Sequence, residues 1–239
     1  MRARRASVAD VIPFSWVDGP GNRFVAFLQG CNLDCLACHN PQTIPLRSAH
    51  AQELTVDDLM ERVRQSMPYI SGVTVSGGEA TLQHEFVLDW FSELKGSRDT
   101  ARLSTLIDTN GTATQATWEA LAPVTDGVMV DLKVLDDGRH RELTGHSNAA
   151  VRESISFLAG TGLLYEVRLL LVPGQNDSDA ELRALADWLL GVDPRVRVKI
   201  NPFMTHGVRA AARGWPQTSA GDESRYRATL TDQGLQNVV

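Results

Sequence analysis

The three cysteines of this chain are the residues whose type and spacing most directly predict chemistry. All of them lie in one short loop, as Cys31, Cys35 and Cys38, and the rest of the 239 residues contains none. Cysteines used only as small core residues would be scattered through strands and helices, so this clustering predicts a thiolate site. Three thiolates are one fewer than a closed four-ligand site needs, which leaves one coordination position for a ligand that is not protein.

Spacing alone leaves three interpretations of the cysteine loop open. Soft thiolate ligands suit an iron–sulfur cluster. A structural zinc held by Cys31, Cys35, Cys38 and His39 is the main alternative, although the adjacent Cys38 and His39 would strain a tetrahedral site. An inert group of buried thiols is the third. An odd number of clustered cysteines does not predict disulfides, and it indicates a reducing, cytoplasmic compartment.

Alternating strand-like and helix-like segments must position this loop. Strands are predicted at 23–29, 72–76, 103–107, 127–132, 164–172 and 196–200. Helices are predicted at 52–65, 85–94, 117–121, 151–158, 179–190 (behind a Ser178 cap) and 222–233, with a long loop over 207–221. This alternation implies a parallel sheet with right-handed crossovers. Six strands are too few for a closed eight-stranded barrel, so the expected fold class is α/β, a partial, open six-stranded parallel (β/α)6 barrel.

Glycines and polar residues follow five of the predicted strands, at the edge where parallel α/β folds bind ligands. They are Gly30, Gly77-Gly78-Glu79, Asp108, Asp131 with Lys133, and Asn201. Glycines at such a place let a ligand approach the backbone closely, and Glu79 could accept a hydrogen bond from a ligand ammonium. A plain strand-to-helix turn explains Gly-Gly-Glu equally well.

Four other side chains are candidates for a site, each with an ordinary alternative. Asp131 and Lys133 share one face of a strand end, where they address a polar ligand or form a surface ion pair. Arg168 lies in an apolar strand, which is costly unless it binds a ligand or pairs with Glu166 or an acid on the next strand. His39, beside the cysteines, is the histidine most suited to a ligand role.

Composition and charge exclude several classes of protein. Hydrophobic residues at 43% and charged residues at 22% are ordinary for a soluble globular protein. The net charge of −6 argues against a protein that binds nucleic acid by neutralising its phosphates. We find no apolar stretch that predicts a membrane span or a signal peptide. We therefore expect a single domain over residues 1–239, with a core at about 22–203 and a C-terminal extension at 204–239.

Together these motifs resemble the radical S-adenosylmethionine (SAM) enzymes, and among them the glycyl-radical-enzyme activases of the pyruvate formate-lyase-activating group. The similarity runs over nearly the whole chain. Its sections are VDGPG at 17–21, LQGCNLDCLACHNP at 28–41, VSGGEATLQ at 75–83, DTNG at 108–111, DGVMVDLK at 126–133, LTG at 143–145 and VRLLLVPG at 167–174. The amino-acid sequences of several segments, including IPFS at 12–15, are most similar to the YjjW type.

The resemblance implies an open barrel of the radical SAM type with a [4Fe–4S] cluster on Cys31, Cys35 and Cys38. The amino and carboxylate groups of SAM would bind the fourth iron. The residues that the resemblance assigns to SAM are His39, Gly77, Gly78, Glu79, Asp108, Asp131, Lys133, Arg168 and His206. It assigns a monovalent cation to Asp108, Thr109 and Met129, and the loop that receives the substrate's glycine strand to Asp18, Gly19, Pro20 and Gly21.

The activity implied is the removal of a glycine Cα hydrogen from a partner glycyl radical enzyme. A 5′-deoxyadenosyl radical would do this, after an electron arrives from a flavodoxin or ferredoxin-type donor. No nucleic-acid or membrane partner is expected. Two alternatives remain at this point: a radical SAM enzyme acting on a small molecule, and a non-catalytic, zinc-stabilised α/β binding module.

Three departures from the family pattern affect these expectations. Ala37 stands where the family usually has an aromatic residue that packs on the adenine of SAM, which shifts that contact toward His39. The chain lacks the ferredoxin-like insert that YjjW-type activases carry, so no auxiliary clusters are expected. The section after His206 matches the family weakly.

Overall fold

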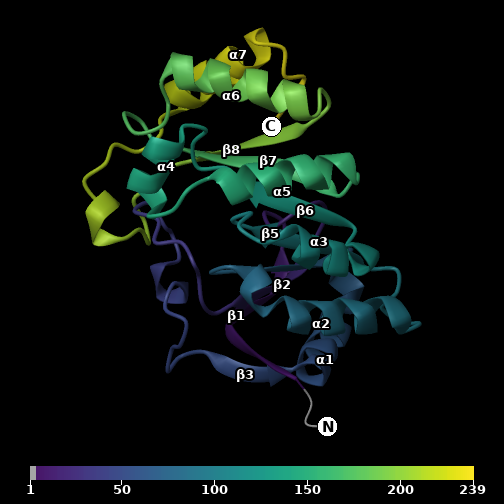
Figure 1. Ribbon diagram of the computed structural model, residues 1–239. Helices are drawn as coiled ribbons and strands as arrows, with labels where there is room; N and C mark the ends of the chain where they lie inside the picture. Colours follow the sequence, from purple (N-terminus) through teal and green to yellow (C-terminus); the bar gives the residue numbers. More distant parts are fainter. Residues whose placement is uncertain (1–3) are drawn as a thin grey trace. The chain divides into compact units, whose positions relative to one another are not determined.

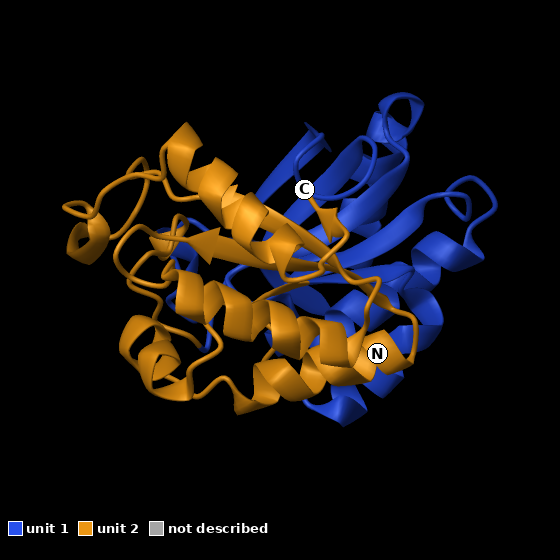
Figure 2. Ribbon diagram, turned by 90° about the horizontal axis from the view of Figure 1, so that it is seen from above, with its two compact units in different colours: residues 1–32, 42–109, 113–129 blue, residues 33–41, 110–112, 130–239 orange. Residues whose placement is uncertain are grey.

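The computed structural model describes residues 4–239, which divide into two compact units (Figures 1 and 2). Unit 1 comprises the described residues up to Asn32 together with Gln42–Thr109 and Ala113–Met129. Unit 2 comprises Leu33–Pro41, Asn110–Thr112 and Val130–Val239. The division passes through the cysteine loop, so Cys31 belongs to unit 1, whereas Cys35 and Cys38 belong to unit 2. The first three residues of the basic N-terminal segment lie outside the described part.

Unit 1 contains a sheet whose strands lie in the order β3-β1-β2-β4-β5. The strands are β1 (Arg5–Ser15), β2 (Arg23–Leu28), β3 (Gln52–Thr55), β4 (Gly72–Gly77) and β5 (Ser104–Thr109). Strands β2, β4 and β5 run parallel, and β1 pairs antiparallel with both β2 and β3. The helices are α1 (Val56–Ser66), α2 (His84–Gly96) and α3 (Gln115–Leu121), with short 3-10 turns η1 (Pro41–Thr43), η2 (Met67–Tyr69), η3 (Ala80–Gln83) and η4 (Ala122–Val124).

Aromatic packing between sheet and helix forms much of the core of unit 1. Phe24 on β2 and Trp90 on α2 are both fully buried, and their ring centroids lie 6.3 Å apart in an edge-to-face arrangement. Trp90 also packs on Phe91, at 5.7 Å. Aromatic pairs in such geometry add to the stabilisation that burial of their area provides, so α2 is fixed firmly against β2.

Unit 2 continues the alternation of strands and helices. Strand β6 (Gly127–Asp131) begins in unit 1 and ends in unit 2, and β7 (Leu164–Leu171), β8 (Arg197–Pro202) and β9 (Asn237–Val238) are parallel neighbours. The helices are α4 (Asp137–Thr144), α5 (Ala149–Gly160), α6 (Asp179–Val192) and α7 (Ala220–Asp232), with a 3-10 turn η5 (Ala210–Ala212). Among the described residues, no helix has both the length and the apolar character that crossing a membrane requires.

The predicted α/β class with an open, mostly parallel sheet is confirmed, and β2, β4, β5, β6, β7 and β8 correspond to the six predicted strands. Three local differences occur. Residues 52–55 form strand β3, which pairs with β1, and the predicted helix begins only at Val56, behind a Thr55–Asp58 capping box. Strand β1 and helix α4 were not expected. The predicted cap at Ser178 is present, where Ser178 and Glu181 form a capping box.

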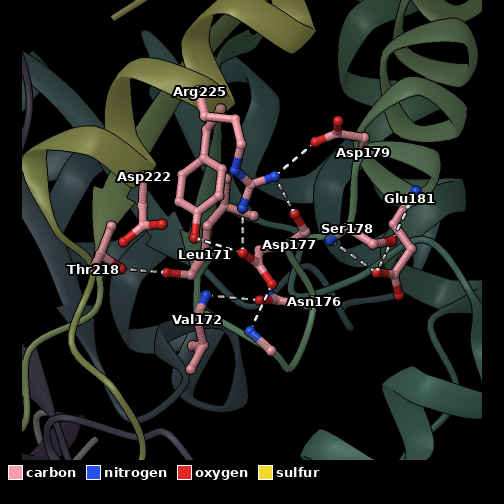
Figure 3. Close-up of polar contacts among 12 residues, drawn as sticks. Leu171, Val172, Asn176, Asp177, Ser178, Asp179, Glu181, Thr218, Asp222 and Arg225 are labelled. Carbon is pink, nitrogen blue, oxygen red and sulfur yellow. Dashed lines mark hydrogen bonds and ion pairs between the residues drawn. The ribbon is translucent and has the colours of Figure 1, made fainter.

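The loop after β7 joins the C-terminal helix to unit 2 through the carboxylate of Asp177 (Figure 3). Asp177 accepts hydrogen bonds from the Arg225 guanidinium at 2.5 Å and from the Tyr226 hydroxyl at 2.9 Å. Burial and the bond to Asp177 raise the pKa of Tyr226, so its hydroxyl stays a donor. This group of side chains explains why α7 packs as part of unit 2 although its helix is mostly polar.

Candidate active site

Cys31 lies directly after β2, and the backbone of unit 1 fixes its position. Gly30 takes a φ of 101°, which favours glycine, and its N–H donates to the Thr43 carbonyl at 2.9 Å. The N–H of Cys31 donates to the Ile44 carbonyl at 3.0 Å. The end of β2 is therefore turned and held before the first thiol, which is half-buried and not in a disulfide.

Cys35 and Cys38 lie in the segment Leu33–Pro41 of unit 2, which the end of helix α4 holds on one side. The N–H groups of Asp34 and Leu36 donate to the carbonyls of Thr144 and Leu143, both at 2.9 Å. These carbonyls lie in the last turn of α4, where a helix leaves acceptors without intrahelical partners. Helix α4 thus holds the backbone on both sides of Cys35.

Charges in unit 2 act on the thiol of Cys38. Burial raises the pKa of this thiol, while a backbone hydrogen bond from Asn40 and the positive charges of Lys133 and Arg209 lower it. Lys133 donates to Asp131 at 2.7 Å. Burial lowers the pKa of Lys133, but the negative charges of Asp131, Cys35 and Cys38 raise it by more than burial lowers it. Lys133 is therefore a permanent cation. Burial has the largest effect, so the pKa of the Cys38 thiol lies above its ordinary value, and the two cations only partly offset that rise toward the thiolate that metal binding needs.

The cysteine loop fits an iron–sulfur cluster by the chemistry of its donors. All three thiols are half-buried, and none is in a disulfide. Among residues 4–239, no three or more histidine, cysteine, aspartate or glutamate side chains are grouped so that they could hold a metal ion. The fit therefore rests on the chemistry of three soft, half-buried thiols, with the fourth position left to a non-protein ligand.

Gly77 and Gly78 allow the end of β4 to approach the backbone that precedes Cys31. A Cβ at Gly77 would lie 2.2 Å from the Leu28 carbonyl oxygen, and one at Gly78 would lie 2.2 Å from that of Gly30. The N–H groups of Gly78 and Glu79 donate to these same two carbonyls, at 2.9 and 2.7 Å. The N–H groups of Gly78 and Glu79 are thus used by the chain itself to brace the backbone that leads to Cys31.

Glu79 is a carboxylate with almost no solvent exposure, at 1%. Its Oε1 accepts hydrogen bonds from the Thr81 N–H at 2.9 Å, the Thr81 hydroxyl at 2.6 Å and the Thr109 hydroxyl at 2.8 Å. The side chain caps η3 and joins the ends of β4 and β5. Its position is therefore fixed by its neighbours before any ligand binds.

The residues assigned to a cation lie at or near the ends of β5 and β6. The Asp108 carboxylate accepts from the Ser76 hydroxyl at 2.8 Å, and Thr109 donates to Glu79. Met129 is fully buried within β6. Ser76, Glu79, Asp108 and Thr109 thus form one polar group at the carboxyl ends of β4 and β5, and the cation assignment itself stays a prediction.

Arg168 is paired as its position in the sequence suggested. Its Nε donates to Glu166 at 3.0 Å, and both side chains are more than nine-tenths buried. The second oxygen of Glu166 accepts from Arg197 Nε at 2.8 Å. Glu166 therefore lies between two guanidinium groups, and the pairing accounts for a buried arginine without a ligand. It also fixes the direction of Arg168, whose assignment to SAM stays a prediction.

The two candidate histidines lie in different surroundings. The Nε2 of His39 is 2.8 Å from the Met204 carbonyl oxygen, and its ring lies 5.7 Å from that of Phe203. Ala37, two residues earlier, packs against the cluster of Val172, Phe203, Val208 and Ala212. His206 is exposed in the loop after β8. His39 is thus held in a defined orientation, whereas no such contact defines the role of His206.

The loop from Asp18 to Gly21 lies at the opposite end of the strands from Cys31, because it precedes β2 and Cys31 follows it. Six residues of β2 separate the two, roughly 20 Å along the strand. A Cβ at Gly19 would lie 2.7 Å from Arg23 Cδ, and one at Gly21 would lie 2.2 Å from the Ser71 hydroxyl. Both glycines have positive φ, at 133° and 68°. The backbone and side chains that approach these glycines are the chain's own.

Contacts between segments far apart in sequence hold the Leu33–Pro41 part of the cysteine loop within unit 2, and the sequence analysis missed most of them. The ion pair between Asp34 and Arg209 joins residues 175 positions apart. The carbonyls of Leu143 and Thr144 carry no side-chain signal. The LTG motif at 143–145 marked the place but assigned it no role.

Comparison with known proteins places these features in a family. A family model described as the radical SAM superfamily matches residues 25–186. Over 199 residues the chain is 36% identical to the pyruvate formate-lyase-activating enzyme of Streptococcus mutans, covering 81% of this chain and 76% of that protein. Over 193 residues it is 37% identical to the pyruvate formate-lyase 1-activating enzyme of Escherichia coli K12, covering 78% of this chain and 76% of that one.

Solved structures share the fold at lower identity. A domain of the pyruvate-formate lyase-activating enzyme from Bacteroides vulgatus matches with a TM-score of 0.59 and 22% identity, over 71% of this chain and 98% of that one. A radical SAM methyltransferase from Sphaerobacter thermophilus matches with a TM-score of 0.67 and 19% identity, over 91% of this chain and 65% of that one. The chain therefore belongs to the radical SAM superfamily, and within it to the pyruvate formate-lyase-activating enzyme group.

Proposed function

We propose that this chain activates a glycyl radical enzyme of the pyruvate formate-lyase class. The observation that carries the proposal is the loop of three half-buried thiols, in a chain 36% identical to a pyruvate formate-lyase-activating enzyme. Membership of the superfamily implies a [4Fe–4S] cluster and SAM, which favours the cluster over the zinc interpretation. We assign the cluster to Cys31, Cys35 and Cys38.

When bound, the cluster and SAM would supply one chemistry: one electron cleaves SAM into methionine and a 5′-deoxyadenosyl radical, which takes a glycine Cα hydrogen and becomes 5′-deoxyadenosine. The protein's own task is to bind, orient and exclude water. Glu79 suits the SAM ammonium, because it is a buried carboxylate fixed by three hydrogen bonds on one oxygen. Lys133 and Arg168 would supply positive charge, and Asp131 a carboxylate.

The remaining assignments are parts of the same proposal. His39 would contact the adenine, since its ring is oriented by Met204 and Phe203 while Ala37 offers no aromatic face. His206 would lie on the ribose side, and Asp108, Thr109 and Met129 would hold a monovalent cation. The loop of Asp18, Gly19, Pro20 and Gly21 would receive the substrate's glycine strand. Gly19 and Gly21 also leave room for the chain's own Arg23 and Ser71.

We further propose a cytoplasmic enzyme of the YjjW type, reduced by a flavodoxin or a ferredoxin-type donor. The YjjW assignment rests on the amino-acid sequence of several segments, including IPFS at 12–15. The need for a donor follows from the chemistry, because cleaving SAM consumes one electron that the chain does not carry. A single electron-transfer protein docking near the cysteine loop would meet that need.

The test is direct formation of the glycyl radical. The chain would be purified without air, reconstituted with iron and sulfide, and mixed with SAM, a reductant and pyruvate formate-lyase. We expect a glycyl radical signal in electron paramagnetic resonance and an equal amount of 5′-deoxyadenosine by chromatography. Cys35→Ala is the matched control and should give neither. If 5′-deoxyadenosine forms but no glycyl radical enzyme of this class acquires a signal, the activase proposal is wrong.

A further inference from the structure

The section that follows β8 makes direct contact with the cysteine loop. We call residues 203–212 the C-terminal strap. The Met204 carbonyl lies 2.8 Å from His39 Nε2, and a Cβ at Gly207 would lie 3.2 Å from the His39 carbonyl oxygen. Ala37 packs against the apolar side chains of the strap. Three separate points of the strap therefore meet the half of the loop that carries Cys38.

The strap is itself fixed to the end of β7. Phe203 has no solvent exposure, and its N–H donates to the Thr218 hydroxyl at 2.9 Å. That hydroxyl donates in turn to the Leu171 carbonyl at 2.8 Å, as Figure 3 shows. Val208 and Ala212 are buried against Val172. A strap held at this many points can hold another segment in place.

Arg209 is the charged contact between the strap and the loop. Its Nη1 donates to the Asp34 carboxylate at 2.5 Å, to the Asp34 carbonyl at 2.9 Å and to the Cys35 carbonyl at 3.3 Å. The Arg209 side chain is 29% exposed and that of Asp34 is 63% exposed. The ion pair by itself would therefore contribute little to stability. The two carbonyl contacts matter more, because they hold a guanidinium against the peptide carbonyls on both sides of the Cys35 Cα.

We propose that Arg209 is a positioning residue for the cluster, which holds the Asp34–Cys35 backbone and raises the reduction potential of the cluster by its positive charge. Reduction adds negative charge to a cluster, and nearby cations stabilise that state. Asp34 partly offsets the effect, because its carboxylate lies against the same guanidinium. The inference rests on the proposed function in so far as the cysteine loop holds a cluster.

The experiment compares the full-length wild-type chain with four variants, each carrying one substitution. Arg209→Gln removes the charge, Arg209→Lys keeps it, and Asp34→Asn removes the offsetting carboxylate. Arg213→Gln is the matched control, because Arg213 is an exposed arginine four residues further on. The midpoint potential of the reconstituted cluster is measured by redox titration with electron paramagnetic resonance. Hydrogen exchange of the segment Leu33–Pro41 is measured on protein without the cluster.

Opposite shifts identify the electrostatic role. We expect a more negative potential in Arg209→Gln, a more positive one in Asp34→Asn, and values near wild type in Arg209→Lys and Arg213→Gln. We also expect faster exchange of the loop in Arg209→Gln. Shifts of the same sign in Arg209→Gln and Asp34→Asn would mean general loosening and would overturn the proposed effect of charge. If Arg209→Gln does not fold, Asp34→Asn still decides the question by the sign of its shift, with Arg209→Lys expected to stay near the wild-type potential.

Failure of this inference is distinct from failure of the proposed function. If the wild-type chain assembles no cluster, the proposed function is wrong, and unchanged exchange in Arg209→Gln would then refute the holding role as well. If the potentials shift as expected but no partner acquires a glycyl radical, the activase proposal fails while the role of Arg209 stands. Unchanged potential and exchange in Arg209→Gln would overturn the inference outright.

Discussion

The carboxylate of Glu79 offers the sharpest test of the SAM site, because the structure separates its local role from its binding role. One oxygen of Glu79 caps η3 and accepts from the hydroxyls of Thr81 and Thr109. Glu79→Ala removes the carboxylate that accepts hydrogen bonds from the Thr81 N–H and from the hydroxyls of Thr81 and Thr109. Loss of the cap costs about 1 kcal/mol, and an unsatisfied buried hydroxyl costs about 1–3 kcal/mol. We therefore expect Glu79→Ala to lower the free energy of unfolding by roughly 2–4 kcal/mol.

Glu79→Gln keeps an oxygen acceptor and removes only the negative charge, so most of this stability should remain. A hydrogen bond to a charged group contributes about 1.5–3 kcal/mol, which corresponds to a SAM affinity roughly 10- to 150-fold weaker in Glu79→Gln. The affinity is measured by anaerobic calorimetric titration of reconstituted protein, normalised to cluster absorbance. Thr81→Val is the matched control: it should lower the melting temperature yet leave the SAM affinity close to wild type. Wild-type affinity in Glu79→Gln would refute the assignment of this carboxylate to SAM.

Three further predictions follow from the cysteine loop and from two structural carboxylates. Wild-type protein reconstituted without air should bind about four irons per chain, and Cys35→Ala should bind far less iron and sulfide by chemical analysis. Stoichiometric zinc in protein purified without air would contradict the assignment of a cluster. Asp177→Ala should lower the free energy of unfolding in urea by about 2–4 kcal/mol, because Arg225 loses its partly buried partner; a loss too small to measure would exclude that role. A hydrogen bond from the Ser147 side chain, then one from a backbone N–H, lowers the pKa of Asp137 from 3.8 to about 2. The stabilising effect of the Asp137 carboxylate should be complete above about pH 4 and disappear as the pH falls toward 2. The difference in the free energy of unfolding between wild type and Asp137→Asn should therefore shrink over that range. A constant difference would contradict the stabilising role of this carboxylate.

The parallel strands could be predicted from sequence because each is a short apolar run that ends in glycine or a polar residue. Gly72–Gly77 is almost entirely buried and alternates Val with small hydroxyl residues, and Leu164–Leu171 is mostly apolar apart from the paired Glu166 and Arg168. Strand β1 gave no such signal, because its residues alternate between buried and exposed and include polar side chains along its length. Residues 52–55 carried a helical spacing into α1, but pairing with β1 extends them instead. Tertiary pairing outweighed local preference there.

The candidate site was predictable in its residue types but less so in its contacts. The thiols, Glu79 and the Asp131–Lys133 pair each follow a strand end, which is where parallel α/β folds carry their ligand-binding groups. The pairing of Arg168 with Glu166 was one of two sequence alternatives, and both partners lie on one face of β7 because they are two residues apart. The contacts of Arg209 and Thr144 with the cysteine loop were not predictable, since they join residues more than 100 positions apart through backbone carbonyls.

The glycines show most clearly why a motif does not by itself reveal what approaches it. Gly19, Gly21, Gly77 and Gly78 all suggested a place where a foreign backbone or ligand could come close. In the structure each of them admits the chain's own atoms, and for Gly77 and Gly78 those atoms are the carbonyls just before Cys31. The same small residues can still be essential to catalysis, because they let β4 brace the cysteine loop at its base. They then help to place the first thiol, and they also present Glu79, the side chain that we propose binds SAM.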